Sequence, residues 1–275
     1  MSWLRPLLLS LMLLALLVGI WAALTRDAAP DTDVDPELAA LLGPSAKGES
    51  PVPGPEDVGR AIWTHLSNPF YDKGPNDKGI GIQLMYSIGR VLLGFALACV
   101  VAIPLGFVVG SSALIRQALE PFIQVLKPIS PLAWMPLALY VIKDAGQSSI
   151  FVIWICSVWP LLLNTAFGVA KVRPAWLNVA RCHEVGWFRR AFTVILPAAA
   201  PTILTGMKIS IGIAWLVIVA AEMLVGGTGI GYFVWNEWNN LSLTNVIVAV
   251  LAIGVVGMVL DQLIAGATRL VAYEE

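Results

Sequence analysis

Charged side chains stand inside or near the ends of the most apolar stretches of this sequence, where ionised groups are costly and therefore point to function. Lys127 and Lys208 could place positive potential along a route for an anion. Arg90, Glu222 and Asp261 are the other ionisable groups of this kind. A group close to the end of an apolar stretch has a more frequent structural explanation, because a long side chain there can reach water. Lys208 lies too deep for that explanation.

Aromatic, sulfur and amide side chains beside prolines add candidates for the wall of such a route. Trp134 and Met135 lie in one proline-interrupted stretch, and Trp159 and Asn164 lie in the next. Large apolar side chains more often pack in a core, so the packing alternative stays open. The predicted substrate-pathway residues are Lys127, Trp134, Met135, Trp159, Asn164, Lys208 and Glu222.

A basic, partly apolar segment, residues 178–193, separates two long apolar stretches. It carries Arg181, Arg189 and Arg190, and its apolar residues alternate with these charges at roughly helical spacing. Positive charge between membrane helices marks the cytoplasmic side. The segment can therefore form short helices at the membrane surface that dock a soluble partner. A basic loop that only sets topology is the alternative.

The sequence contains no recognisable enzymatic site. A G-x-x-x-x-G-K-[ST] phosphate loop is absent, and the glycine-rich run GGTGIG (226–231) follows an apolar helix and not a strand, which argues against dinucleotide binding. His65 and His183 are far apart in the sequence and form no metal signature. We expect no metal, cofactor or catalytic cluster in this chain.

Composition excludes an ordinary soluble domain. Hydrophobic residues make up 58% of the 275 residues and charged residues only 13%, whereas soluble domains average about 25% charged residues. A helix needs about 20 apolar residues to cross a bilayer. The sequence predicts an all-α polytopic membrane protein with six transmembrane helices, at 6–24, 82–110, 121–142, 149–170, 197–225 and 244–267.

Three regions follow from these spans. Residues 1–25 form the first transmembrane helix, for which a cleaved signal peptide is the less favoured alternative. Residues 26–80 form an external arm in which Pro55 starts a short amphipathic helix. Residues 81–275 form a core of five transmembrane helices that includes the cytoplasmic loop 171–196.

Prolines single out the third span as an irregular helix. Pro128, Pro131 and Pro136 all fall within it, and the carbonyl groups that prolines leave unpaired in a membrane must be satisfied by neighbouring helices or by water. This span is therefore the best candidate to line a pathway.

The distribution of basic residues fixes the predicted topology. With the amino terminus inside, the short outer loops carry only Lys143, and residues 226–243 form an outer connection rich in aromatic side chains. Arg116 marks a short inner loop. The basic residues placed in the cytoplasm are Arg5, Arg116, Lys171, Arg173, Arg181, Arg189, Arg190 and Arg269.

The basic segment resembles the "EAA" loop of type I ATP-binding-cassette importer permeases, in which Glu-Ala-Ala is followed by Gly four residues on and by Leu-Pro thirteen residues beyond that Gly. Counting back from Pro197, Ala180 occupies the last alanine position and Glu184 the glycine position. Asn178 and Val179 depart from the pattern. The resemblance is closest to the nitrate/bicarbonate branch of the nitrate, sulfonate and taurine permeases, on the stretches 68–81, 128–143, 159–169 and 213–235.

The resemblance implies an assembly of two permease copies, two cytoplasmic ATP-binding subunits and a periplasmic substrate-binding protein, in a bacterial inner membrane. ATP and Mg²⁺ would be held by the partner subunits, and the loop would form a coupling helix in a cleft of the ATPase. The positions that would make this contact are Ala180, Arg181, Glu184, Gly186, Trp187, Arg189, Arg190 and Pro197.

The function implied by the resemblance is the import of nitrate, with nitrite as a related cargo, by alternating access. Bicarbonate, cyanate, taurine or an alkanesulfonate in the same architecture is the first alternative. A secondary anion transporter or channel ranks lower, because the sequence shows no convincing inverted repeat. A membrane enzyme would need a catalytic cluster that the sequence lacks.

Overall fold

The computed structural model describes residues 4–26, 52–74 and 76–271, and the secondary structure of this part is helical apart from one isolated bridge between Asp72 and Lys78. Five helical segments are long and apolar enough to cross a membrane, and a bent helix pair adds a sixth if it counts as one span. This confirms the all-α, multi-pass architecture. The five segments are built on α1 (Leu4–Arg26), α4 (Ile80–Ser111), α7 (Ala145–Ala170), α10 (Leu196–Val225) and α12 (Leu243–Val271).

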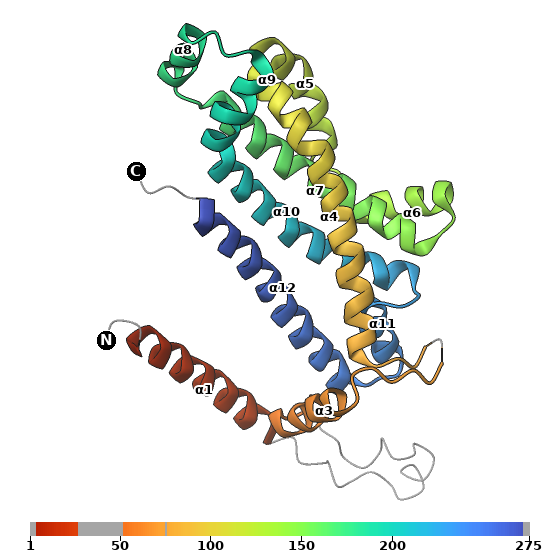
Figure 1. Cartoon of the computed structure of the whole chain (residues 1–275). Coiled ribbons are helices and arrows are strands. Elements are labelled where there is room, and N and C mark those ends of the chain that lie inside the picture. The colour runs from red at the N-terminus through yellow and green to blue at the C-terminus, as the bar shows by residue number, and fades with distance from the viewer. Residues whose placement is uncertain (1–3, 27–51, 75, 272–275) are drawn as a thin grey trace, which may run out of the picture.

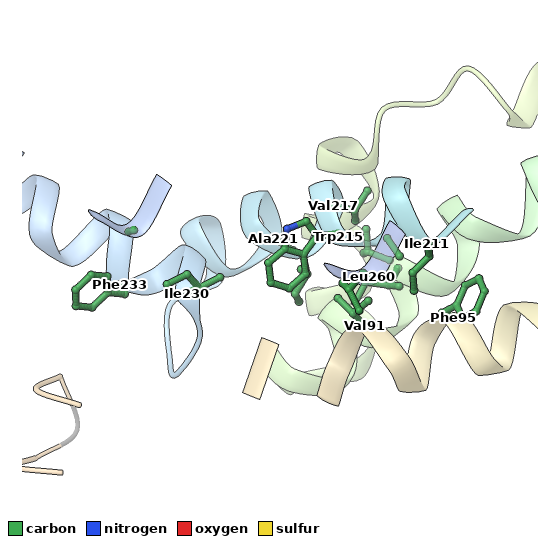
Figure 2. Close-up of a cluster of buried hydrophobic side chains, with 14 of the residues drawn as sticks. Val91, Phe95, Ile211, Trp215, Val217, Ala221, Ile230, Phe233 and Leu260 are labelled. Carbon is green, nitrogen blue, oxygen red and sulfur yellow. The ribbon is translucent and has the colours of Figure 1, made fainter. Parts of the chain in front are cut away.

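The core of the molecule is a layer in which α4, α7 and α10 pack side by side (Figure 1). Close packing requires small residues: a Cβ atom at Gly106 of α4 would lie 2.6 Å from the Cβ of Thr165 of α7. Toward the outer end of the layer, Val91 of α4, Trp215 of α10 and Leu260 of α12 belong to one buried apolar cluster (Figure 2). Apolar area removed from solvent in this way stabilises the layer.

The proline-rich third span is not one membrane helix. It consists of α5 (Ala113–Leu126) and α6 (Pro131–Ile142), which are bent by 89° relative to each other. Pro128 lies in the break and Pro131 in the first turn of α6, where its missing N–H costs no hydrogen bond. The prediction of an irregular span broken at its prolines is confirmed, but the helical segment starts at residue 113 and not at 121, so the inner loop expected at Arg116 is part of α5.

The cytoplasmic segment forms short helices, as predicted, but its end was placed wrongly. It comprises α8 (Pro174–Cys182), α9 (Trp187–Arg190) and a π-helical turn, η2 (Ala191–Ile195). η2 continues into α10, so the helical backbone runs unbroken from residue 187 to residue 225. Residues 187–196 thus belong to the long helix, because the charges of Arg189 and Arg190 do not interrupt helical geometry.

The outer side carries two short helices. The first, α3 (Pro55–Ser67), begins where predicted, with Glu56 and Asp57 in its first turn, where the helix dipole favours acids. The second, α11 (Ile230–Asn239), lies in the connection that the sequence predicted as a loop. The long helix α1 meets α3 and diverges from the core layer (Figure 1). Of the acidic arm predicted at 27–54, residues 27–51 lie outside the described residues.

Candidate functional site

The cytoplasmic end of the molecule presents an exposed surface of apolar and basic side chains. Val179 on α8 and Trp187 and Phe188 on α9 are exposed, as are Arg181 and Arg189. Exposed apolar side chains in such a group mark an interaction surface. The structure therefore brings the predicted coupling residues of α8 and α9 to one end of the protein.

A tight turn joins these two short helices. Glu184 adopts a left-handed backbone conformation with φ of +50°, and the N–H of Val185 donates to the carbonyl of Ala180 at 3.0 Å. Glycine accepts this conformation without steric cost, whereas a residue with a Cβ does not. Glu184 occupies the position at which the resembled loop pattern has glycine, so the turn keeps the geometry of the pattern although the residue differs. Ala180 is buried beneath the turn.

At the opposite end of the molecule, Glu222 of α10 is buried in a polar network and is only 1% exposed. Arg90 Nη1 donates to its Oε1 at 2.8 Å. The hydroxyl of Ser87 lies 2.7 Å from Oε2, and the backbone N–H of Gly231 donates to the same oxygen at 3.1 Å. Both carboxylate oxygens are thus occupied by donors of the protein.

The same network holds the loop between α10 and α11 against α4. Arg90 also donates to the carbonyl of Thr228 at 2.6 Å. The side chains of Gln83 and Ser87 accept from the backbone N–H groups of Gly229 and Ile230 at 2.6 and 2.9 Å. Buried polar groups are stable when they are hydrogen-bonded in this way. The network joins α4, α10 and the start of α11 into one body.

Close approach explains the glycine-rich run 226–231. A Cβ atom at Gly229 would collide with the carboxyl group of Glu222, and one at Gly231 would collide with the carbonyl of Val219. Gly226 and Gly227 have positive φ values of 77° and 94°. These glycines serve a turn and close packing.

The interpretation of Arg90 and Glu222 as separate side chains that reach water is therefore wrong. Their partners Gln83 and Ser87 were not among the residues predicted from the sequence. One signal was available, because positions 83, 87 and 90 follow the i, i+4, i+7 spacing of one helix face. Glu222, placed among the pathway residues, does not face open space in this structure.

A second ion pair lies between α10 and α12. Lys208 Nζ is 3.2 Å from Asp261 Oδ2, and the two side chains are 44% and 52% exposed. The pair thus differs from that of Glu222 in facing away from the packed layer. Lys208 and Asp261 were singled out separately by the sequence, and the structure brings them together.

The remaining predicted pathway residues do not form one cluster. Met135 is only 2% exposed and belongs to the apolar core, with Trp134 packed against it, which favours the packing alternative. The amide of Asn164 donates to the carbonyl of Pro160 at 2.8 Å, within its own helix. Trp159 is half-buried on the same helix, and Lys127 is exposed at the break after α5.

No group of three or more His, Cys, Asp or Glu side chains that could hold a metal ion occurs among the residues that the structure describes. The main polar features of the described residues are therefore the two ion pairs and the cytoplasmic surface.

Comparisons with proteins of known family agree with one another. Residues 102–272 match the family described as the binding-protein-dependent transport system inner membrane component. A protein named nitrate import permease protein NrtB from Synechocystis sp. is 44% identical over 82% of both chains. A protein named bicarbonate transport system permease protein CmpB from Synechocystis sp. is 38% identical over 87% of this chain and 89% of its own.

A solved structure supports the fold. A chain of the MetNI methionine ABC transporter, in inward-facing conformations, superimposes with a TM-score of 0.62 over 69% of this chain and 94% of its own, at 11% identity. Such low identity bears on the fold and not on the cargo. The chain belongs to the binding-protein-dependent transport system inner membrane component family, and it is a multi-pass permease subunit of an ATP-binding-cassette importer, a transport component and not an enzyme.

Proposed function

We propose that this protein is the permease of a nitrate importer and carries the anion from a periplasmic binding protein into the bacterial cytoplasm through the inner membrane. The observation that carries the proposal is the 44% identity to a protein named nitrate import permease over four fifths of both chains. The cationic side chain of Lys208 within a membrane span is compatible with an anionic cargo.

The proposed assembly has two copies of this chain, two ATP-binding subunits at the cytoplasmic surface and the binding protein outside. ATP and Mg²⁺ would belong to the ATP-binding subunits. Their closure would push on α8 and α9, and because α9 continues through η2 into α10, the movement would reach the membrane layer directly. The partner thereby biases a two-state element in this chain.

Bicarbonate is the second candidate cargo, because a bicarbonate permease is 38% identical over most of both chains. The two cargoes are separated by purifying the tagged complex from its native host and measuring ATPase activity with the binding protein loaded with nitrate or with bicarbonate. Stimulation by nitrate alone is the expected result. Stimulation by bicarbonate alone would make bicarbonate the cargo in place of nitrate. Failure of any ATPase to co-purify would contradict the proposal that the protein is part of an ATP-driven importer.

The coupling surface has its own test. Replacing Arg189 and Arg190 with Glu puts two negative charges on the exposed end of α9. We expect uptake to fall by at least about tenfold while ATP hydrolysis continues, because reversing the charge of a docking surface removes its electrostatic complementarity to the partner. Arg60→Glu on the outer helix α3 is the matched control. Unchanged uptake in the double variant would contradict the coupling role.

A further inference from the structure

The Lys208–Asp261 pair lies at membrane depth. With a rise of 1.5 Å per residue, Lys208 stands about 18 Å beyond Leu196, where α10 begins, and Asp261 about 15 Å before the inner end of α12. A hydrocarbon core is about 30 Å thick, so neither charge can be explained by the membrane surface.

Contact between the exposed side of this pair and lipid would cost free energy. A charged side chain at the centre of a membrane helix costs about 2.5–3.5 kcal/mol on insertion scales. The α10 face next to Lys208 presents small or polar residues, Pro201, Thr205 and Gly212, together with the apolar Ile209 and Leu216, all exposed in the single chain. By contrast, the exposed surface of α1 is rich in leucine, as a lipid-facing surface should be. Because the charge of Lys208 disfavours lipid, we expect the face around it to border water in the assembled transporter.

The geometry of the pair allows exchange. Lys208 and Asp261 make a 3.2 Å contact, and both side chains remain about half exposed. A carboxylate and a small oxyanion present the same chemistry to an ammonium group, namely negatively charged oxygen acceptors. An anion that reaches Lys208 from the open side can take the place of Asp261, provided that the released carboxylate, which is 52% exposed, turns to water on that side.

We propose that Lys208 is an anion-binding residue of the transport route and that Asp261 is its exchangeable counter-ion. The ligand class is a small monovalent oxyanion, and this inference rests on the proposed function. The anion displaces the carboxylate on arrival, and the carboxylate returns to Lys208 when the anion leaves. The return of Asp261 lowers the affinity of Lys208 for the departing anion, which favours release.

A charge swap distinguishes this role from a structural ion pair. We expect the variant Lys208→Asp with Asp261→Lys to keep the pair and the assembled complex but to lose at least about tenfold in nitrate uptake, because the cation has moved to α12. A structural pair would work in either orientation, so wild-type uptake in the swapped variant would overturn the proposal. The same swap at Asp57 and Arg60, an exposed pair 3.4 Å apart on α3, is the matched control.

Direct binding gives a second readout. Nitrate retained by the purified full complex without binding protein is measured by equilibrium dialysis. We expect Lys208→Gln to abolish retention, Lys208→Arg to preserve it, and Asp261→Asn to tighten it by about tenfold, because the competing carboxylate is gone. Equal loss in Lys208→Gln and Asp261→Asn would overturn the exchange. Absence of nitrate uptake by the wild-type complex would instead overturn the proposed function.

Discussion

Two ion pairs of the same chemistry sit in the membrane layer, and their surroundings differ. Arg90 and Glu222 are joined by hydroxyl and backbone donors, and Glu222 has almost no exposed surface. Lys208 and Asp261 touch each other and leave half of their surface open. The two pairs are thus distinguished by their exposure and not by their residue types. The buried pair stabilises the fold, whereas the half-exposed pair is the one that a ligand could reach.

The largest expected effect is at the buried pair. Glu222→Ala removes the carboxylate that Arg90 and Ser87 share as an acceptor, and removing one partner of a buried pair costs about 3–5 kcal/mol. We expect a clear drop in the thermal unfolding temperature of the purified complex in detergent. Glu222→Gln keeps an acceptor oxygen and should lose less. If Glu222→Ala unfolds at the wild-type temperature, the network does not stabilise the outer end.

A smaller loss is expected where the loop meets the same carboxylate. Gly229→Ala places a methyl group against the carboxyl group of Glu222, and overpacking of this kind costs about 1–3 kcal/mol. Gly254→Ala on α12 is the control, because no side chain and no atom of another element lies within 4 Å of the added Cβ. Equal unfolding temperatures for the two alanine variants would mean that the loop moves to accommodate the added methyl group at little cost in stability.

Variants of the half-exposed pair, Lys208 and Asp261, should affect transport and leave stability nearly unchanged. Pairs with this much exposure contribute about 0–1 kcal/mol to stability, so Lys208→Gln and Asp261→Asn should unfold within about 1 kcal/mol of the wild type. Uptake in the Lys208→Gln variant should nevertheless fall, which separates stability from transport. A loss of stability as large as that of Glu222→Ala would remove the contrast between the two pairs.

Another small effect on stability is expected at a third charged residue, where the free-energy cost comes from the backbone conformation. Glu184 has a left-handed conformation that costs a non-glycine residue about 1 kcal/mol. Glu184→Gly should therefore stabilise the turn between α8 and α9 slightly, as read from proteolysis at this turn. Glu184→Ala, which keeps the Cβ, is the control and should bring no gain. Faster cleavage of the glycine variant would contradict the prediction.

Much of the fold could be predicted from the sequence, because membrane helices are recognised by the length and the apolar composition of their segments. The amphipathic helix from Pro55 and the irregular third span were also readable, since prolines constrain the backbone locally. The 89° bend, the helical course of 187–196 and α11 were not, because they depend on packing between segments that are distant in sequence.

The candidate site was readable only in part for the same reason. Lys208, Glu222 and Asp261 stand out as charges in apolar stretches. Which of them is satisfied depends on Gln83 and Ser87, more than a hundred residues away, and on backbone N–H groups that carry no sequence signal. The pairing of Lys208 with Asp261 likewise requires the packing of α10 on α12.

In the mechanism proposed above, the unbroken helix from α9 through η2 and α10 would act as a lever between the cytoplasmic surface and the outer end. At 1.5 Å per residue, its 39 residues span about 58 Å, more than the thickness of the bilayer. A tilt of about 10° at the cytoplasmic tip would shift the far end by about 10 Å, on this same length. Because Glu222 ties that end to α4 and to the loop before α11, the stroke would be delivered to the whole outer rim at once.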